Sequence, residues 1–118
     1  MEKKIYIASD HAGYELKSKL CNFFKTFIDL GTNSNERVDY PDFAYKLTSK
    51  VSHNNDSFGV LICGTGVGMS IAANREKMIR AGLVNSPEIA RLIRQHNDAN
   101  VLVLPGRFMK EKEAIECI

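Results

Sequence analysis

One cysteine stands where thiol chemistry and anion binding could meet. Cys63 ends the apolar run "GVLIC" and is followed at once by Gly64, Gly66 and Gly68. Glycines at this spacing let the backbone approach a ligand closely and direct several N–H groups toward it, which is a common way to bind an anion. A thiol beside such groups lies where the thiolate form is favoured. That thiolate could remove a proton next to a carbonyl while the N–H groups hold the resulting enediolate.

The same stretch also fits two simpler interpretations. Free cysteine is often a small buried hydrophobe, and a glycine-rich turn can join a strand to a helix without binding anything. A nucleotide loop fits less well. The dinucleotide fingerprint has the spacing G-x-G-x-x-G after a first strand, whereas here the spacing is G-x-G-x-G after the third predicted strand. A Walker loop is excluded because no Gly-Lys-Ser or Gly-Lys-Thr follows.

Two of the three histidines have an aspartate close by and stand near predicted strand ends. Asp10 and His11 directly follow the first predicted strand, and His96 with Asn97 and Asp98 leads into the fifth. Neutral imidazole can take and give a proton near pH 7, which the opening of a cyclic sugar requires. We expect the segment "RQHND" to fold back, so that both histidines converge on one sheet edge. A metal site is disfavoured, because these residues show neither i,i+4 nor CxxC spacing.

The hydrophobic pattern predicts the scaffold that positions these residues. Five apolar runs alternate with helical patterns, which is typical of a parallel sheet covered on both faces, with ligands at the carboxyl ends of its strands. Ser86 and Pro87 mark the start of the fourth helix. We predict a three-layer α/β/α Rossmann-like fold with a five-stranded parallel sheet, as a single domain over residues 1–118. The expected strands are 4–9, 27–31, 57–63, 79–85 and 100–104, and the expected helices are 14–27, 41–52, 69–77, 86–96 and 110–118.

Composition excludes several classes of protein. The net charge of +2 is small and basic residues are interspersed with acidic ones, so no nucleic-acid surface is expected. No apolar run approaches the ~18 residues of a membrane span. Three cysteines without a CxxC pair or a secretion signal fit the reducing cytoplasm. Cys21 and Cys117 are expected to be structural residues of helices, and His53 is expected at a surface helix end.

Taken together, four segments carry a resemblance to a known family. They are "ASDHAGYELK", "GTNSNERVDYPDFA", "GVLICGTGVGMSIAANR" and "RQHNDANVLVLPGR", and in this order they resemble ribose-5-phosphate isomerase type B from Ile5 to Arg107. The resemblance implies interconversion of ribose 5-phosphate and ribulose 5-phosphate in the pentose phosphate pathway, through an enediolate and without metal or organic cofactor. Isomerisation of a six-carbon sugar phosphate, such as allose 6-phosphate or galactose 6-phosphate, stays open as an alternative. So does sugar-phosphate binding without catalysis.

The resemblance also implies a role for individual residues. Cys63 would move the proton between C2 and C1 of the sugar, and His96 would assist ring opening. Asp10 and His11 would lie near the other end of the sugar, and Arg107 would meet the phosphate. The rest of the implied site comprises Gly64, Thr65 (grouped with the catalytic residues), Gly66, Val67 and Gly68 around the enediolate, Ser70 just beyond, Asn97 at the hydroxyls and Tyr40 as a wall.

Two further implications concern assembly and the phosphate. Relatives form their site between two subunits, so a homodimer or a tetramer with shared active sites is expected. Family members also continue into a tail with a "GGRHxxR"-like motif whose arginines join the phosphate site, whereas this sequence ends at "EAIECI". The expectation is therefore either that Arg107 and His11 alone bind the phosphate or that this stretch is inactive without the tail.

Overall fold

The computed structural model describes residues 3–52 and 56–118, and His53 lies outside them. Five strands alternate with five helices along the described chain. The strands are β1 (Lys4–Ser9), β2 (Ile28–Asp29), β3 (Ser57–Cys63), β4 (Ala81–Leu83) and β5 (Val101–Pro105), and the helices are α1 (Tyr14–Phe23), α2 (Tyr40–Ser52), α3 (Val67–Ala73), α4 (Pro87–Asn97) and α5 (Glu111–Cys117).

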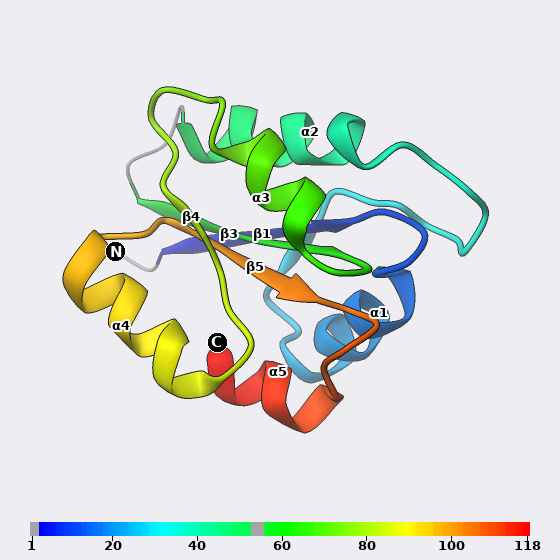
Figure 1. Ribbon diagram of the computed structural model, residues 1–118. Coiled ribbons are helices and arrows are strands. Elements are labelled where there is room, and N and C mark those ends of the chain that lie inside the picture. Colours follow the sequence, from blue (N-terminus) through cyan, green and yellow to red (C-terminus); the bar gives the residue numbers. More distant parts are fainter. Residues whose placement is uncertain (1–2, 53–55) are drawn as a thin grey trace.

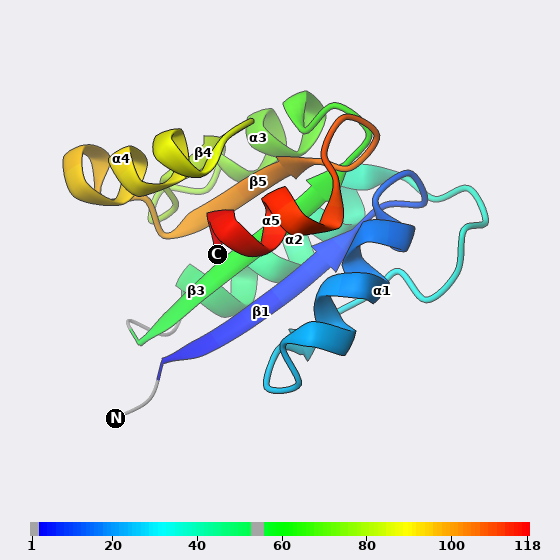
Figure 2. The ribbon, with the colours of Figure 1, turned by 90° about the horizontal axis from the view of Figure 1, so that it is seen from below.

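The strands form one parallel sheet in the order β2-β1-β3-β5-β4. Helices α2 and α3 cover one face of it, and α1, α4 and α5 cover the other (Figures 1 and 2). Helices α1 to α4 each return the chain to the end of the sheet where the strands begin, which is how consecutive parallel strands are connected. The predicted three-layer fold with a five-stranded parallel sheet is confirmed.

Strand residues alternate between two hydrophobic cores. Leu61 is fully buried among side chains of α2 and α3, such as Leu47, and the next residue, Ile62, is fully buried on the opposite face among side chains of α1, such as Leu20. Because both faces of β3 are covered, its sequence is continuously apolar rather than alternating. This explains why β3 could be placed over 57–63 from the sequence.

Two helices differ in extent from their predicted ranges. Helix α1 ends at Phe23, because Phe24 adopts an extended backbone. The rings of Phe24 and Phe27 stack with centroids 4.7 Å apart and pack against the core on the α1 side, so the apolar spacing continues through a turn. Helix α3 starts two residues before the predicted range and stops at Ala73. It stops there because the Asn74 amide bonds the carbonyls of Ser70 and Ala81.

Helix α4 begins as predicted. The Ser86 hydroxyl accepts a hydrogen bond from the Ile89 N–H at 3.3 Å, and Pro87 is the first helical residue. Within the described residues, every helix is too short or too polar to cross a membrane.

Candidate active site

The strand order reverses between the carboxyl ends of β1 and β3, and this candidate ligand position is here called the crevice. From β1 the chain crosses to β2 on one side, and it later returns to β3 on the other side. Ligands of open parallel sheets bind where the strand order reverses in this way. Ser9 is in register with Ile62, so Asp10 and Cys63 follow as the next residues of two neighbouring strands. Two of the residues singled out in the sequence therefore stand side by side.

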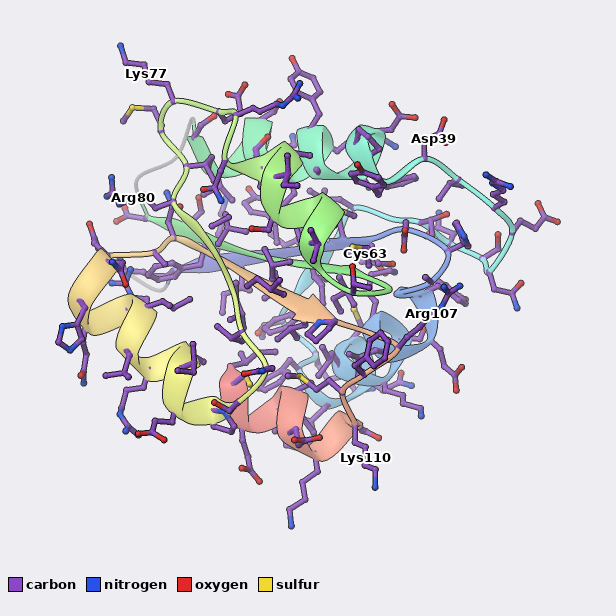
Figure 3. All side chains as sticks on the ribbon, viewed as in Figure 1. Asp39, Cys63, Lys77, Arg80, Arg107 and Lys110 are labelled. Atoms are coloured by element: carbon purple, nitrogen blue, oxygen red, sulfur yellow. The ribbon has the colours of Figure 1, made fainter. Side chains whose placement is uncertain are left out.

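Cys63 is held at this edge by the loop that follows β5. Its carbonyl accepts a hydrogen bond from the Gly106 N–H at 2.8 Å, and the carbonyl of Gly64 accepts one from the Arg107 N–H at 3.0 Å. The Cys63 side chain is only 5% exposed and belongs to the core on the α2 and α3 side. Figure 3 shows Cys63 and Arg107 at the same end of the sheet. The thiol is therefore buried at the carboxyl end of β3 rather than open at the surface.

The glycine loop is shaped by one left-handed residue. Gly66 has φ of 82° and is the N-cap of α3, and a Cβ there would clash with the Leu83 side chain. Only glycine adopts this conformation without strain. The Thr65 hydroxyl accepts a hydrogen bond from the Val67 N–H at 3.2 Å, which closes the turn. The chain therefore turns sharply after Cys63 and presents the first N–H groups of α3 at the crevice.

Tyr40 covers the start of α3. A Cβ built on Gly68 would lie 2.7 Å from the Tyr40 ring, so the ring rests directly on the glycine backbone. The Tyr40 side chain itself is 39% exposed. Ser70 lies one turn further along α3, where its N–H donates to the Gly66 carbonyl. The predicted wall residue is therefore in place beside the loop, with the ring open to solvent on its outer side.

Asp10 has a structural task at the end of β1. Its Oδ1 accepts hydrogen bonds from the N–H groups of Ala12 at 2.9 Å and Gly13 at 3.1 Å, and the side chain is 7% exposed. A Cβ at Gly13 would lie 2.5 Å from the Ile62 carbonyl oxygen, so only glycine allows α1 to start this close to β3. Sequence reasoning assigned Asp10 to the substrate and did not identify this role in the turn.

His11 joins the end of β1 to the long loop before α2. Its Nδ1 lies 3.2 Å from both the carbonyl oxygen and the N–H nitrogen of Val38. The ring accepts from the N–H or donates to the carbonyl, depending on its tautomer. Either bond leaves Nε2 available for a ligand.

His11 and Arg107 also line one broad hollow of about 920 Å³. Lys19 and Lys110 line it as well, and so do two acidic side chains, Glu15 and Glu111. Three basic side chains stand against these two carboxylates, and Lys19 already lies 3.7 Å from Glu15, so the hollow has a small positive excess that favours an anion beside Arg107 and Lys110. Both lysines were missed in the sequence, because charged residues on helices usually mark only a solvated face.

His96 and Asn97 lie near the end of the sheet where the strands begin, opposite the end that carries Cys63. This contradicts the expectation that "RQHND" folds back toward the crevice. They are the last two residues of α4, and both are exposed. The chain then enters the start of β5, where Asn100 accepts a hydrogen bond from the Gly59 N–H. Strand residues rise about 3.3 Å each, so the four steps from Gly59 to Cys63 cover roughly 13 Å. Within one chain, His96 and Cys63 are not brought together.

The other two thiols of the chain have raised pKa values. Burial, together with the charge of Asp29, raises the pKa of Cys21. Burial and the charges of Glu113 and Glu116 raise the pKa of Cys117 to about 11. Both thiols therefore carry their proton near neutral pH. Within 3–52 and 56–118, no three His, Cys, Asp or Glu side chains cluster closely enough to hold a metal ion.

Comparison with known proteins agrees with this geometry. The family described as Ribose/Galactose Isomerase matches residues 5–118. Ribose-5-phosphate isomerase B of Escherichia coli is 45% identical over 91% of this chain and 74% of its own length. The chain belongs to this family of sugar-phosphate isomerases, and the resemblance found in the sequence is confirmed.

Solved structures of the family share the fold. The crystal structure of a ribose 5-phosphate isomerase from Thermotoga maritima is 50% identical and superimposes with a TM-score of 0.95, covering 99% of this chain and 83% of that one. Ribose-5-phosphate isomerase B from Mycoplasma genitalium, solved with bound ribulose-5-phosphate, is 46% identical with a TM-score of 0.93, covering 99% and 81%.

Proposed function

We propose that this chain is an aldose–ketose isomerase that interconverts ribose 5-phosphate and ribulose 5-phosphate. The observation that carries the proposal is Cys63 at the end of β3, followed by the left-handed Gly66 that turns the backbone into α3. The bound ribulose-5-phosphate of the M. genitalium relative supports this substrate class. We further propose that residues 1–118 act as a single domain in the cytoplasm, which the three free thiols support.

The chemistry follows from the position of the thiol. The Cys63 thiolate takes the proton from C2 of the open-chain aldose, and the electron pair moves through C1 onto O1 to give an enediolate. The loop N–H groups of Gly64, Thr65, Gly66 and Gly68 stabilise the charge on the enediolate oxygens, while the Val67 N–H stays bonded to the Thr65 hydroxyl. The Cys63 thiol then returns the proton to C1, while the O2 hydroxyl gives up its proton to O1 and becomes the ketone. No redox partner is needed, because one proton moves between neighbouring carbons.

The phosphate is proposed to bind in the hollow shared by His11 and Arg107. The Arg107 guanidinium is a permanent cation able to make paired hydrogen bonds to a phosphate. In this arrangement Asp10 holds the turn on which His11 stands. Its free oxygen can accept a bond from a sugar hydroxyl. The observation that supports this placement is the shared hollow, together with the backbone link between Arg107 and Gly64.

The position of His96 and Asn97 supports a site shared between two copies of the chain. We propose a homodimer, alone or within a tetramer, in which the α4 end of one copy completes the crevice of the other. There His96 would open the sugar ring and Asn97 would bind hydroxyls. Apolar side chains are exposed around the crevice on α2 and α3, as expected of an interface: Tyr40 39%, Tyr45 66%, Val67 49% and Ile71 57%.

One observation favours a second candidate function, sugar-phosphate binding without turnover. Cys63 is 5% exposed in the single chain, so a ligand could occupy the cationic hollow without reaching the thiol. Ribose 5-phosphate would then raise the melting temperature of the protein without being converted. Turnover separates this candidate from the first.

The test is an assay of the purified chain with ribose 5-phosphate, in which ribulose 5-phosphate is followed with and without EDTA. We expect turnover that is insensitive to EDTA, lost in Cys63→Ala and kept in the matched variant Cys21→Ala. Turnover that stops on chelation would refute the metal-free mechanism. Full activity in Cys63→Ala would remove the proposed base. Allose 6-phosphate and galactose 6-phosphate, assayed in parallel, decide between five- and six-carbon substrates.

A further inference from the structure

We propose that Asp98 is a positioning residue whose carboxylate, held between Arg80 and Arg94, fixes the end of α4 and thereby aims His96 and Asn97. This inference rests on the proposed function, in which those two residues complete the site of a neighbouring copy. It concerns a cluster that lies at the opposite end of the sheet from Cys63, as the position of Arg80 in Figure 3 shows.

The backbone of Asp98 sets the direction in which the chain leaves α4. Asp98 has φ of 51° and ψ of 42°, and among the described residues it is the one non-glycine residue with positive φ. Its N–H and the Ala99 N–H both donate to the Ile93 carbonyl, which ends the helix. This left-handed conformation strains most side chains, although Asp and Asn tolerate it best. An aspartate is therefore among the residues that suit this position, and contacts of its side chain can give it further support.

Two guanidinium groups supply that support. Arg80 Nη2 lies 2.9 Å from Asp98 Oδ2, and Arg80 Nε donates to the Asp98 carbonyl at 3.1 Å. On the other side, Arg94 Nη1 lies 3.2 Å from Asp98 Oδ1 and donates to the Ala99 carbonyl at 2.5 Å. Each arginine thus joins the carboxylate to a backbone carbonyl of the same turn. The turn is held from two directions, both at positions adjoining Asn97.

The two arginines are themselves anchored. The Arg80 N–H donates to Asn100 Oδ1 at 2.8 Å, and Asn100 Nδ2 donates to the Met78 carbonyl at 3.0 Å, which ties the β4 entrance to the β5 entrance. The Arg94 guanidinium lies over the Phe58 ring, 4.9 Å from its centroid. The clamp is therefore built on β3, β4 and β5 rather than on freely moving side chains.

The local charge explains why this carboxylate matters more for position than for global stability. A hollow of about 270 Å³ at this edge is lined by Lys3, Lys77, Arg80 and Arg94, and Asp98 is the single carboxylate among its described lining residues. Without it, the cations would repel one another, and each arginine would keep only its bond to a backbone carbonyl of the turn. The side chains of Arg80, Arg94 and Asp98 are 59%, 49% and 72% exposed. Ion pairs as exposed as these add little to the free energy of unfolding.

The decisive variant is Asp98→Gly, because glycine adopts the left-handed backbone freely and loses only the carboxylate. Asp98→Asn keeps an acceptor oxygen, and Glu88→Gln, at the other end of α4, controls for the lost charge. For Asp98→Gly we expect kcat to fall about tenfold or more, as a small misplacement of reacting groups does. The melting temperature should change little, and Asp98→Asn should recover most of the activity. Unchanged kcat in Asp98→Gly would overturn the proposal.

A mutant cycle shows whether Asp98 acts through His96 and Asn97. In a background that lacks both positioned side chains, His96→Ala with Asn97→Ala, Asp98→Gly should lower the residual kcat no further than about twofold, because both groups that it positions are already gone. The full tenfold loss in that background would overturn the positioning role.

Amide hydrogen exchange tests the clamp without reference to activity. Relative to their intrinsic rates, the N–H groups of residues 98 and 99 should exchange about tenfold faster in Asp98→Gly than in the wild type, while those of β3 stay unchanged. Equal exchange rates would mean that the clamp does not hold the turn. A wild-type chain without turnover would refute the proposed function and with it the positioning of an isomerase site, and the exchange rates would still decide whether the clamp exists.

Discussion

The backbone N–H of Arg107 donates to the carbonyl of Gly64 at 3.0 Å, so the candidate phosphate ligand is tied to the residue that follows the candidate base. The side chain lies close as well, because a Cβ on Gly64 would stand 3.4 Å from the Arg107 Cδ. A second bond from Gly106 to the Cys63 carbonyl doubles this link. The backbones of Cys63 and Arg107 are therefore fixed relative to one another by hydrogen bonds between the ends of β3 and β5.

Arg107→Ala should weaken phosphate binding while leaving the thiol in place. The link to Cys63 and Gly64 runs through the backbone, which alanine keeps, so the loop geometry survives. We expect KM for ribose 5-phosphate to rise by about ten- to a hundredfold, as expected when a charge-assisted bond to phosphate is lost. Steady-state kinetics measures this, with the exposed Arg91→Ala on α4 as the matched control. An unchanged KM would place the phosphate elsewhere.

Gly66→Ala and Gly64→Ala should differ sharply in stability. At Gly66, alanine meets both a φ of 82° and the Leu83 side chain, whereas at Gly64 it makes only ordinary contacts. We expect Gly66→Ala to lower the free energy of unfolding by about 1–3 kcal/mol and Gly64→Ala by less than about 1 kcal/mol. Urea denaturation compares the two variants directly. Equal losses would contradict the assignment of strain to Gly66.

The contrast between Gly64 and Gly66 also shows which features of the loop could be predicted from the sequence and which could not. The run over 57–63 and the glycines after it predicted a strand, a tight turn and a helix, because a strand buried on both faces is continuously apolar. Which glycine adopts positive φ could not be predicted. That depends on Leu83, from a distant strand, which closes the space over Gly66.

The position of His96 was misjudged for a different reason. The strand-end rule applies to loops that follow strands, whereas "RQHND" ends a helix, and a crossover helix returns to the starting edge of the sheet. The order of elements in the sequence therefore already indicates that the end of this helix lies where the strands begin, away from Cys63. The burial of Lys17 could not be predicted from the sequence, because its partner Asp29 lies on another element, β2. Family resemblance named the candidate site residues and implied a site between two subunits, and the structure showed which of these residues one chain separates, Cys63 and His96.

Lys17 and Asp29 should tolerate replacement unequally. The Lys17 side chain is 1% exposed and its Nζ lies 2.7 Å from Asp29 Oδ2, while Asp29 is 37% exposed. Asp29→Ala leaves a buried ammonium without its partner, and we expect a loss of about 2 kcal/mol, reduced because Asp29 is partly solvated. Lys17→Met removes the buried charge and fills the space, so the loss should stay below about 1 kcal/mol. Chemical denaturation measures both, and the reverse order would contradict a buried-charge penalty.

The two helical thiols should react slowly with iodoacetamide. With its pKa raised to about 11 by burial, Glu113 and Glu116, Cys117 is about one part in a thousand thiolate at pH 8. We expect its alkylation, followed by mass spectrometry, to be about a hundredfold slower than that of free cysteine. Glu116→Gln should speed it, and Glu111→Gln, a carboxylate that does not contribute to the raised pKa, serves as control. Rapid labelling at pH 8 would refute the raised pKa.

The same shift predicts how stability depends on alkaline pH. The folded Cys117 thiol keeps its proton to a higher pH than the unfolded one, so its effect on stability is fully present below the ordinary pKa of about 9. Stability should therefore fall as the pH rises from about 9 to about 11. Cys117→Ala should flatten this part of a denaturation series, and an unchanged slope would contradict the linkage.

Mixing two strongly impaired variants should restore activity if the site is shared between copies. In a mixed dimer of Cys63→Ala and His96→Ala chains, one crevice lacks both groups and the other has both intact. Random pairing makes half of the dimers mixed, and half of their sites are complete, so about a quarter of wild-type activity should return. The variants are refolded together and assayed with ribose 5-phosphate, beside each variant refolded alone. If Cys63 and His96 instead served one crevice within a chain, the mixture would show only the average of the two variants, and the placement of α4 at the opposite edge would have no bearing on catalysis.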